Sequence, residues 1–178
     1  GTGGTISGIA RFLKEQNPKV QIIGADPDGS IYAKPQGPLH QYKVEGIGED
    51  FYPGTMDLSL VDRIVTTDDS QAFLTARRLA REEGILAGGS SGAATFAALQ
   101  VAKELDESAV VVVLLPDGGR GYLSKMYSDD WMRQNGFLEQ PETVPGSAEK
   151  IKENEVATQR NNFGRQAGNP RDLVLNSR

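Results

Sequence analysis

The stretch Gly1-Thr2-Gly3-Gly4-Thr5-Ile6-Ser7-Gly8 leads directly into an amphipathic segment, Ile9 to Lys14. Glycines let a backbone turn sharply and approach a ligand, and a following helix points unpaired N–H groups and its positive dipole end back at the turn. The hydroxyls of Thr2, Thr5 and Ser7 add donors. The spacing matches neither the lysine-bearing P-loop nor the GxGxxG of a dinucleotide fold. The stretch therefore predicts either a phosphate cradle or a tight loop with a good helix cap.

The composition excludes several classes of protein. The 178 residues carry a formal net charge of -5, which argues against a nucleic-acid surface or a patch for anionic membranes. Cysteine is absent, which excludes disulfides, thiolate metal ligands and a cysteine nucleophile, and fits a cytoplasmic protein. No apolar run approaches the ~20 residues of a membrane span. Because neither Met nor a strand precedes the glycine loop, we expect a piece of a longer chain.

Apolar spacing and turn residues predict alternating helices and short strands. We expect helices over residues 5–16, 68–83, 93–105 and 128–137, and strands over 20–25, 61–66, 84–87 and 110–115. The run over 110–115 is aliphatic throughout, which is typical of a strand in the middle of a covered sheet. The predicted fold class is α/β, with a mainly parallel three-layer sheet and helices on both faces.

Further loops carry candidate binding residues. The stretch Val44-Glu45-Gly46-Ile47-Gly48-Glu49-Asp50-Phe51 predicts either a loop whose amides approach a ligand or a surface turn with solvated acids. The stretch Gly88-Gly89-Ser90-Ser91-Gly92 places amides and hydroxyls before a second helix. The segment from Pro116 to Tyr122 follows the aliphatic run, and ligands of open α/β sheets collect at such carboxyl ends of strands.

The composition changes near residue 138. Residues 138–178 are polar and rich in proline and glycine, which predicts a linker or partly ordered tail with a short helix over 148–160. The expected organisation is one compact part over residues 1–137 followed by this tail.

With these loops laid out, the chain resembles the cysteine synthase/cystathionine β-synthase family of fold-type II enzymes, which depend on pyridoxal phosphate. The matching stretches, in family order within residues 1–137, are residues 1–8, 23–30, 44–48, 88–92 and 115–132. The turn Asp26-Pro27-Asp28-Gly29-Ser30 and the ending Tyr122 to Met132 look more like cystathionine β-synthases than cysteine synthases, and Glu49 looks like the bacterial type. The resemblance implies the C-terminal part of the catalytic region, within the larger domain and incomplete.

The resemblance also implies a set of binding residues and no metal. Amides and hydroxyls of the first loop would hold the cofactor phosphate, and Ser90 would meet the pyridine nitrogen as a neutral partner, which suits β-replacement better than transamination. The implied cofactor-binding residues are Gly1, Thr2, Gly3, Gly4, Thr5, Ser90, Pro116 and Asp117. The implied substrate-binding residues are Gly46, Glu49 and Tyr122.

One departure from the family concerns the catalytic lysine. The family forms its Schiff base through a lysine upstream of the phosphate loop, in a half that this sequence does not contain. None of the eight lysines present matches that motif. Since such a lysine must be desolvated and placed at the cofactor, we expect the catalytic lysine outside this chain and the chain alone to be inactive.

The resemblance implies a lyase of transsulfuration and cysteine biosynthesis, in a cytoplasmic homodimer without nucleic-acid or membrane partners. Its amino-acid substrates would be serine, or an activated serine, and homocysteine, which give cystathionine. One alternative is a cysteine synthase that uses O-acetylserine and sulfide. Another is a non-catalytic module that binds a phosphate ligand or a partner, although Ser90 would then have no purpose. A nicotinamide-binding Rossmann domain is disfavoured by the glycine spacing.

Overall fold

The computed structural model describes residues 1–32 and 37–140. Its elements are α1 (Gly4–Gln16), β1 (Ile23–Pro27), η1 (Leu58–Leu60), β2 (Arg63–Thr67), α2 (Asp69–Glu83), α3 (Gly89–Ala102), η2 (Gly119–Tyr122) and α4 (Asp129–Gln134). The strands β1 and β2 pair in parallel, with Ile23 opposite Arg63 and Pro27 opposite Thr67. The predicted α/β class with a parallel sheet is therefore confirmed. The predicted helix over 148–160 lies outside the described residues, as does the predicted tail beyond Gln140.

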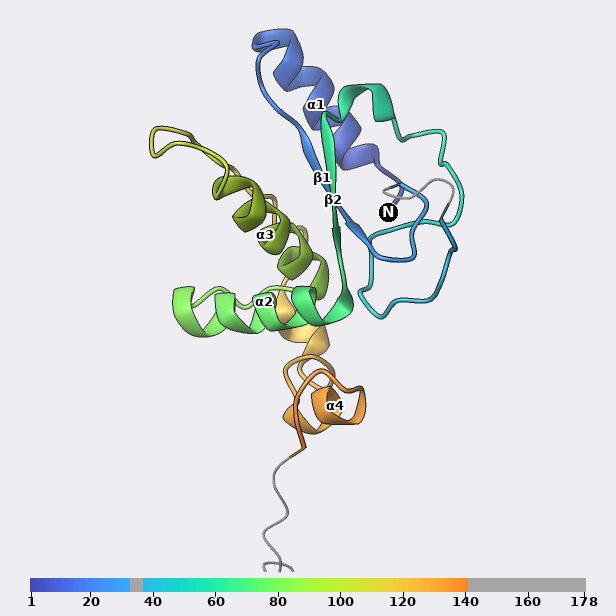
Figure 1. Ribbon diagram of the computed structural model, residues 1–178, viewed down its shortest axis with the longest axis vertical. Coiled ribbons are helices and arrows are strands. Elements are labelled where there is room, and N and C mark those ends of the chain that lie inside the picture. The colour runs from blue at the N-terminus through green and yellow to red at the C-terminus, as the bar shows by residue number, and fades with distance from the viewer. Residues whose placement is uncertain (33–36, 141–178) are drawn as a thin grey trace, which may run out of the picture. The chain divides into compact units, whose positions relative to one another are not determined.

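Helices cover the two strands from both sides. Figure 1 shows α1 on one side of β1 and β2 and α3 on the other. Gly24 of β1 lies close to α1, since a Cβ at this glycine would lie 3.6 Å from Cδ1 of Ile6. The helix α3 contacts both strands.

Helix α2 begins and ends where the sequence predicts. The carboxylate of Asp68 accepts from the backbone N–H of Gln71 at 2.7 Å, and the Gln71 side chain accepts from the Asp68 N–H at 3.0 Å. This capping box satisfies two N–H groups that a helix start leaves unpaired. The helix ends at Gly84, whose φ of 71° is in the left-handed region that favours glycine.

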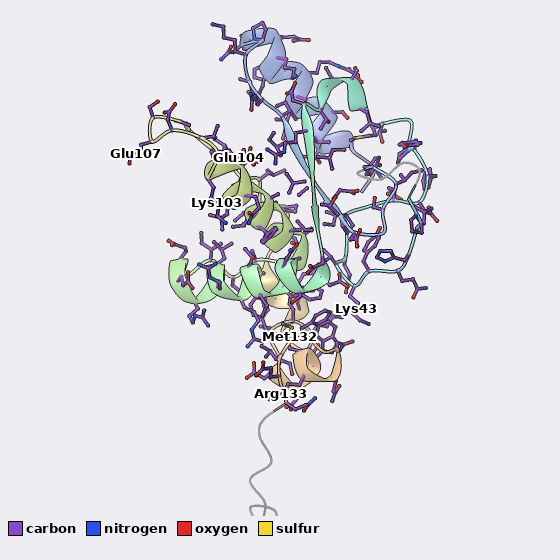
Figure 2. All side chains as sticks on the ribbon, viewed as in Figure 1. Lys43, Lys103, Glu104, Glu107, Met132 and Arg133 are labelled. Atoms are coloured by element: carbon purple, nitrogen blue, oxygen red, sulfur yellow. The ribbon has the colours of Figure 1, made fainter. Side chains whose placement is uncertain are left out.

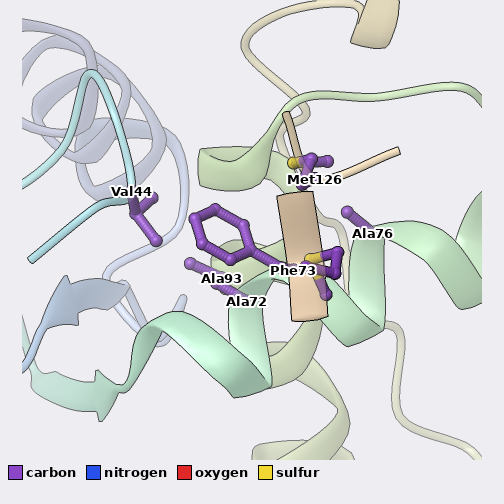
Figure 3. Packing of buried hydrophobic residues seen from close by; sticks show 7 residues of the cluster. Val44, Ala72, Phe73, Ala76, Ala93 and Met126 are labelled. Carbon is purple, nitrogen blue, oxygen red and sulfur yellow. The ribbon is translucent and has the colours of Figure 1, made fainter. Parts of the chain in front are cut away.

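The core lies between α2, α3 and the segment that contains α4. The Phe73 ring packs edge-on against Trp131 and Phe137, with ring centroids 5.6 Å and 5.1 Å apart. Val44 and Met126 are buried in the same cluster. Figure 3 shows the Phe73 ring between Val44 and Met126. The core therefore ties the loop around residue 44 to the end of the described chain.

Two predicted strands are wrong. Residues 110–115 form no strand, and Val112 is 88% exposed. An aliphatic strand is stable only when neighbouring strands take its hydrogen bonds, and among the described residues the sheet consists of β1 and β2 alone. The predicted strand over 84–87 is reduced to an isolated antiparallel bridge between Ala87 and Gly118.

Candidate active site

The first loop leaves the amino-terminal end of α1 open. Its N-cap, Gly3, has a φ of 75°, and no side chain caps the helix. A Cβ at Gly3 would overlap Met56, whereas a Cβ at Gly4 would have nothing within 4 Å. The first turn carries no acidic residue. Free amides, open space and the absence of a negative side chain make this helix end suitable for an anion.

Hydrogen bonds from other segments hold the first loop in place. Tyr32 donates its phenolic O–H to the carbonyl oxygen of Gly1 at 2.8 Å, and Thr55 donates its hydroxyl to that of Thr2 at 2.7 Å. The Ser7 hydroxyl accepts from the N–H of Asp57 at 2.9 Å. The bonds from Tyr32 and Thr55 occupy the loop's carbonyls and none of its amides, so the donors of the loop stay free for a ligand.

The loop over residues 44–49 lies against the first loop. A Cβ at Gly1 would lie 3.0 Å from the carbonyl oxygen of Gly46 and 3.7 Å from Oε1 of Glu49. Gly46 and Gly48 have φ values of 81° and 75°, which favour glycine. The Glu49 N–H donates to the Ser30 hydroxyl at 3.0 Å. The structure thus brings Gly1, Gly46 and Glu49 together.

A second group of polar side chains surrounds the carboxylate of Asp117. Tyr122 donates its O–H to Oδ2 at 2.7 Å, and the Ser90 hydroxyl lies 3.4 Å from Oδ1. The Gly88 N–H donates to the Asp117 carbonyl at 3.2 Å, and Gly88 has no room for a Cβ beside this carboxylate. The hydrogen bond to Asp117 raises the pKa of Tyr122 to about 12. Three of the predicted site residues therefore form one cluster. Pro116, which was predicted for the same site, precedes Asp117 and is exposed.

The loop over residues 43–49 connects the first loop, at the start of α1, with the cluster around Asp117. The Asp69 carboxylate, in the first turn of α2, accepts from the N–H groups of Lys43 and Val44 at 2.8 Å and 2.9 Å. Figure 2 shows Lys43 beside this turn. Glu45 then forms an ion pair with Lys125, near Tyr122, while Gly46 reaches Gly1. Asp69, Lys125, Tyr32 and Thr55 were missed by sequence reasoning, because single polar residues far apart in the chain give no local pattern.

An open hollow adjoins Glu49. Its volume is about 470 Å³, and its lining includes His40, Tyr42, Glu49 and Asp50. Burial raises the pKa of Tyr42, and the carboxylates of Asp26, Glu49 and Asp50 raise it further. The hollow therefore carries negative charge that favours a cation.

Comparisons with known proteins place the chain in a family. Residues 1–117 match the family model described as pyridoxal-phosphate dependent enzyme. The chain is 53% identical over 146 residues to cystathionine β-synthase of Oryctolagus cuniculus, covering 80% of this chain and 26% of the relative. It is 44% identical over 133 residues to a cysteine synthase of Staphylococcus aureus, covering 73% of this chain and 42% of the relative. The chain belongs to the pyridoxal-phosphate-dependent enzymes.

A solved structure supports the same family. The O-acetylserine-dependent cystathionine β-synthase from Helicobacter pylori superposes with a TM-score of 0.66 at 42% identity, covering 70% of this chain and 40% of that one. The chain spans about a quarter of the length of the cystathionine β-synthases of Oryctolagus cuniculus and Dictyostelium discoideum. The predicted resemblance to this family is confirmed, and pyridoxal phosphate is the family's cofactor.

The residues present fit the phosphate and the ring of pyridoxal phosphate. The open helix end at Gly4 can take the phosphate, because a Cβ at Gly4 would have nothing within 4 Å, no side chain caps the helix and its first turn carries no acid. The hydroxyl of Ser90 is a neutral partner that suits a ring nitrogen. Within the described ranges, no group of three His, Asp or Glu is placed to hold a metal ion, and none of the helices is long and apolar enough to cross a membrane.

Proposed function

We propose that this chain forms the phosphate-binding and ring-binding part of a lyase that joins serine, or an activated serine, to homocysteine to give cystathionine. The observation that carries the proposal is the loop over residues 43–49. It lies against the open end of α1 at Gly46 and is joined by Glu45 to Lys125, near the Asp117 cluster. A ligand bound both at the open end of α1 and at the Asp117 cluster would lie next to this loop. The activity would serve cysteine biosynthesis by transsulfuration.

In this proposal the first loop binds the phosphate. The amides of Gly4 and Thr5 donate to it, and the exposed hydroxyls of Thr2 and Thr5 add bonds. The dipole of α1 offsets part of the charge of the phosphate. Pyridoxal phosphate, when bound, supplies the electron sink for removal of the β-substituent of the amino acid.

The other residues orient the ring and the substrates. Ser90 would hold the ring nitrogen, and Pro116 and Asp117 would bind beside the ring. Gly46 leaves its backbone free to approach the amino acid that reacts. Glu49 faces the hollow of about 470 Å³, where its carboxylate can bind the ammonium group of homocysteine. Tyr122 completes the wall between Ser90 and the loop over residues 43–49.

A cysteine synthase is the second candidate. The identity of 44% to the relative from Staphylococcus aureus favours it. The substrate of such an enzyme would be O-acetylserine with sulfide in place of homocysteine. Sulfide has no ammonium group, so the acidic hollow next to Glu49 would have no role in this reaction. The hollow therefore favours the first candidate.

The test compares the two sulfur donors on the cofactor-loaded enzyme that joins this chain to the half carrying the Schiff-base lysine, because the chain alone is expected to be inactive. Serine or O-acetylserine is supplied with homocysteine or sulfide, and the products are identified by mass spectrometry. We expect cystathionine as the main product. The Glu49→Gln variant should raise the KM for homocysteine several-fold and leave the KM for serine unchanged, because only the ammonium contact is lost. Glu107→Gln, in an exposed turn, is the matched control.

The other outcomes separate the alternatives. Cysteine as the main product, with a KM for sulfide that Glu49→Gln does not change, would favour the cysteine synthase. Bound cofactor without any product would favour the non-catalytic binding module. Absence of cofactor binding would contradict the proposal as a whole.

A further inference from the structure

A short segment that precedes η1 holds the first loop from outside. The Thr55 hydroxyl donates to the Thr2 carbonyl at 2.7 Å, and the Asp57 N–H donates to the Ser7 hydroxyl at 2.9 Å. Met56 stands between these two anchored residues in the chain, so its side chain is brought to the same loop. The proposed function gives this methionine no role.

The thioether of Met56 packs directly against the backbone of the first loop. A Cβ at Gly3 would overlap Sδ, Cγ and Cβ of Met56, so the methionine fills the place that this glycine leaves open. The Ser7 hydroxyl donates to Sδ at 3.8 Å, and this bond is weak because a thioether sulfur is a poor acceptor. Gly3 is the N-cap of α1. The sulfur therefore lies against the residue that directly precedes the amides proposed to bind the phosphate.

Met56 differs from the other methionines in its access to solvent. The sequence holds three methionines, and all of them lie within the described residues. Met126 and Met132 are 1% and 0% exposed and belong to the core around Phe73. Met56 is only partly buried, and Thr55 beside it is exposed. A dissolved oxidant therefore reaches the sulfur of Met56 more readily than the other two sulfurs.

We propose that Met56 is an oxidation site, at which a peroxide weakens the binding of the cofactor phosphate to the first loop. Hydrogen peroxide transfers one oxygen atom to Sδ. A lone pair of the sulfur forms the S–O bond, the O–O bond of the peroxide breaks, and water leaves. The sulfur is oxidised to a sulfoxide and the peroxide is reduced. The proposal rests on the proposed function, because it needs the phosphate at the first loop.

A sulfoxide does not suit the position that the thioether occupies. Oxidation turns a flexible apolar side chain into a polar one that carries a strong acceptor. A sulfoxide oxygen packed against the Cα of Gly3 would lose its hydration, so the oxidised side chain turns toward water and leaves this contact. The N-cap of α1 then loses its packing partner. The amides of Gly4 and Thr5, which follow it, are no longer held in one direction for the phosphate.

The experiment uses the complete enzyme that joins this chain to the half carrying the Schiff-base lysine. The cofactor-free enzyme is treated with hydrogen peroxide, and mass spectrometry of its peptides follows each methionine. Met56 should gain one oxygen atom before Met126 and Met132 do. The Kd of pyridoxal phosphate, from an absorbance titration, should then rise roughly tenfold, about the effect of losing one hydrogen bond to a charged group. Methionine sulfoxide reductase should restore the original Kd.

Two variants assign the effect to this methionine. Met56→Leu keeps nearly the same volume and has no sulfur to oxidise. Met132→Leu is the matched control, since it removes a buried methionine from the core. Each variant is judged by the ratio of its Kd after peroxide to its own Kd before, so that any change caused by the substitution itself divides out. The ratio should be about one in Met56→Leu and should match the wild type in Met132→Leu.

The outcomes separate this inference from the proposed function. Oxidised Met56 with an unchanged Kd would overturn the inference and leave the function standing. A rise in Kd that persists in Met56→Leu would also overturn it, because the sensitive residue would then lie elsewhere in the enzyme. Oxidation of Met126 or Met132 before Met56 would contradict the accessibility on which the inference depends. No binding of pyridoxal phosphate by the untreated wild type would mean that the proposed function itself has failed.

Discussion

The two glycine-rich stretches that the sequence predicts as loops, residues 1–8 and 88–92, both run into a helix, yet their structures differ. Residues 89–92 form the first turn of α3 rather than a loop before it. In the first loop, space is open around Gly4 and Gly8. In the second, Gly89 lies against Phe73 and Gly92 against Ala72, and the serines between them are buried. Glycine therefore leaves open space in the first loop and permits close packing of helices in the second. The predictions below test this difference.

The largest effect is expected in the second loop. In Gly92→Ala the new Cβ would lie 2.9 Å from Cβ of Ala76 and overlap the Ala72 carbonyl, so α2 and α3 must move apart. Overpacking of this kind should lower the free energy of unfolding by about 3 kcal/mol. Urea unfolding followed by circular dichroism measures it.

The matched control lies in α1. In Gly8→Ala the new Cβ has nothing within 4 Å. Because alanine favours a helix interior over glycine, this variant should gain about 0.5–1 kcal/mol. Equal losses in Gly92→Ala and Gly8→Ala would contradict the division into a packed and an open loop.

The next effect tests the one strained position of the first loop. Gly3→Ala places a side chain at a φ of 75° and against Met56. The left-handed conformation costs a residue with a Cβ about 1–2 kcal/mol, which should appear in urea unfolding. Gly4→Ala, one residue later in open space, should leave stability nearly unchanged. A loss in Gly4→Ala as large as in Gly3→Ala would show that this end of α1 is not open.

Loss of a single hydrogen bond should lower the free energy of unfolding more in the second loop than in the first. Ser91→Ala removes a fully buried hydroxyl that holds Asp117, which should cost about 1 kcal/mol. Thr55→Val removes the exposed bond to the Thr2 carbonyl and should cost roughly half of that. Thermal unfolding of the two variants measures both losses. A larger loss for Thr55→Val would reverse the assignment of the buried and exposed loops.

The smallest effect concerns two tyrosines, one beside each loop. The pKa of each is raised to about 12, mainly by burial for Tyr32 and mainly by the hydrogen bond to Asp117 for Tyr122. Since the folded pKa is raised above the unfolded value of 10.0, each contribution to stability is complete below pH ~10 and is lost as the pH rises through about 12.

Carbon-13 NMR of the tyrosine Cζ atoms can separate these causes. Asp117→Asn should lower the pKa of Tyr122 toward its ordinary value and leave that of Tyr32 where it is. Equal changes at both tyrosines would mean that the variant alters the whole structure rather than one bond.

Much of the fold follows from local sequence. Asp68 with Gln71, and Gly84 at the other end, fix α2 because a capping box and a left-handed C-cap involve only neighbouring residues. The start of α1 after Gly3 likewise depends only on neighbouring residues. The strand over residues 110–115 was predicted wrongly, since an aliphatic run shows the preference of a segment and not whether partner strands are available.

In the candidate site, too, some features follow from local sequence and others depend on tertiary packing. The sequence alone determined which loops carry amides and hydroxyls, and its motifs indicated the family, because residue types and spacing are properties of the chain itself. Only the tertiary structure decided that Gly46 lies against Gly1, that Glu45 pairs with Lys125 and that Asp117 lies beside Ser90. These contacts join segments 27 to 80 residues apart. Such contacts depend on how helices and loops pack in three dimensions, which no local pattern of residues encodes.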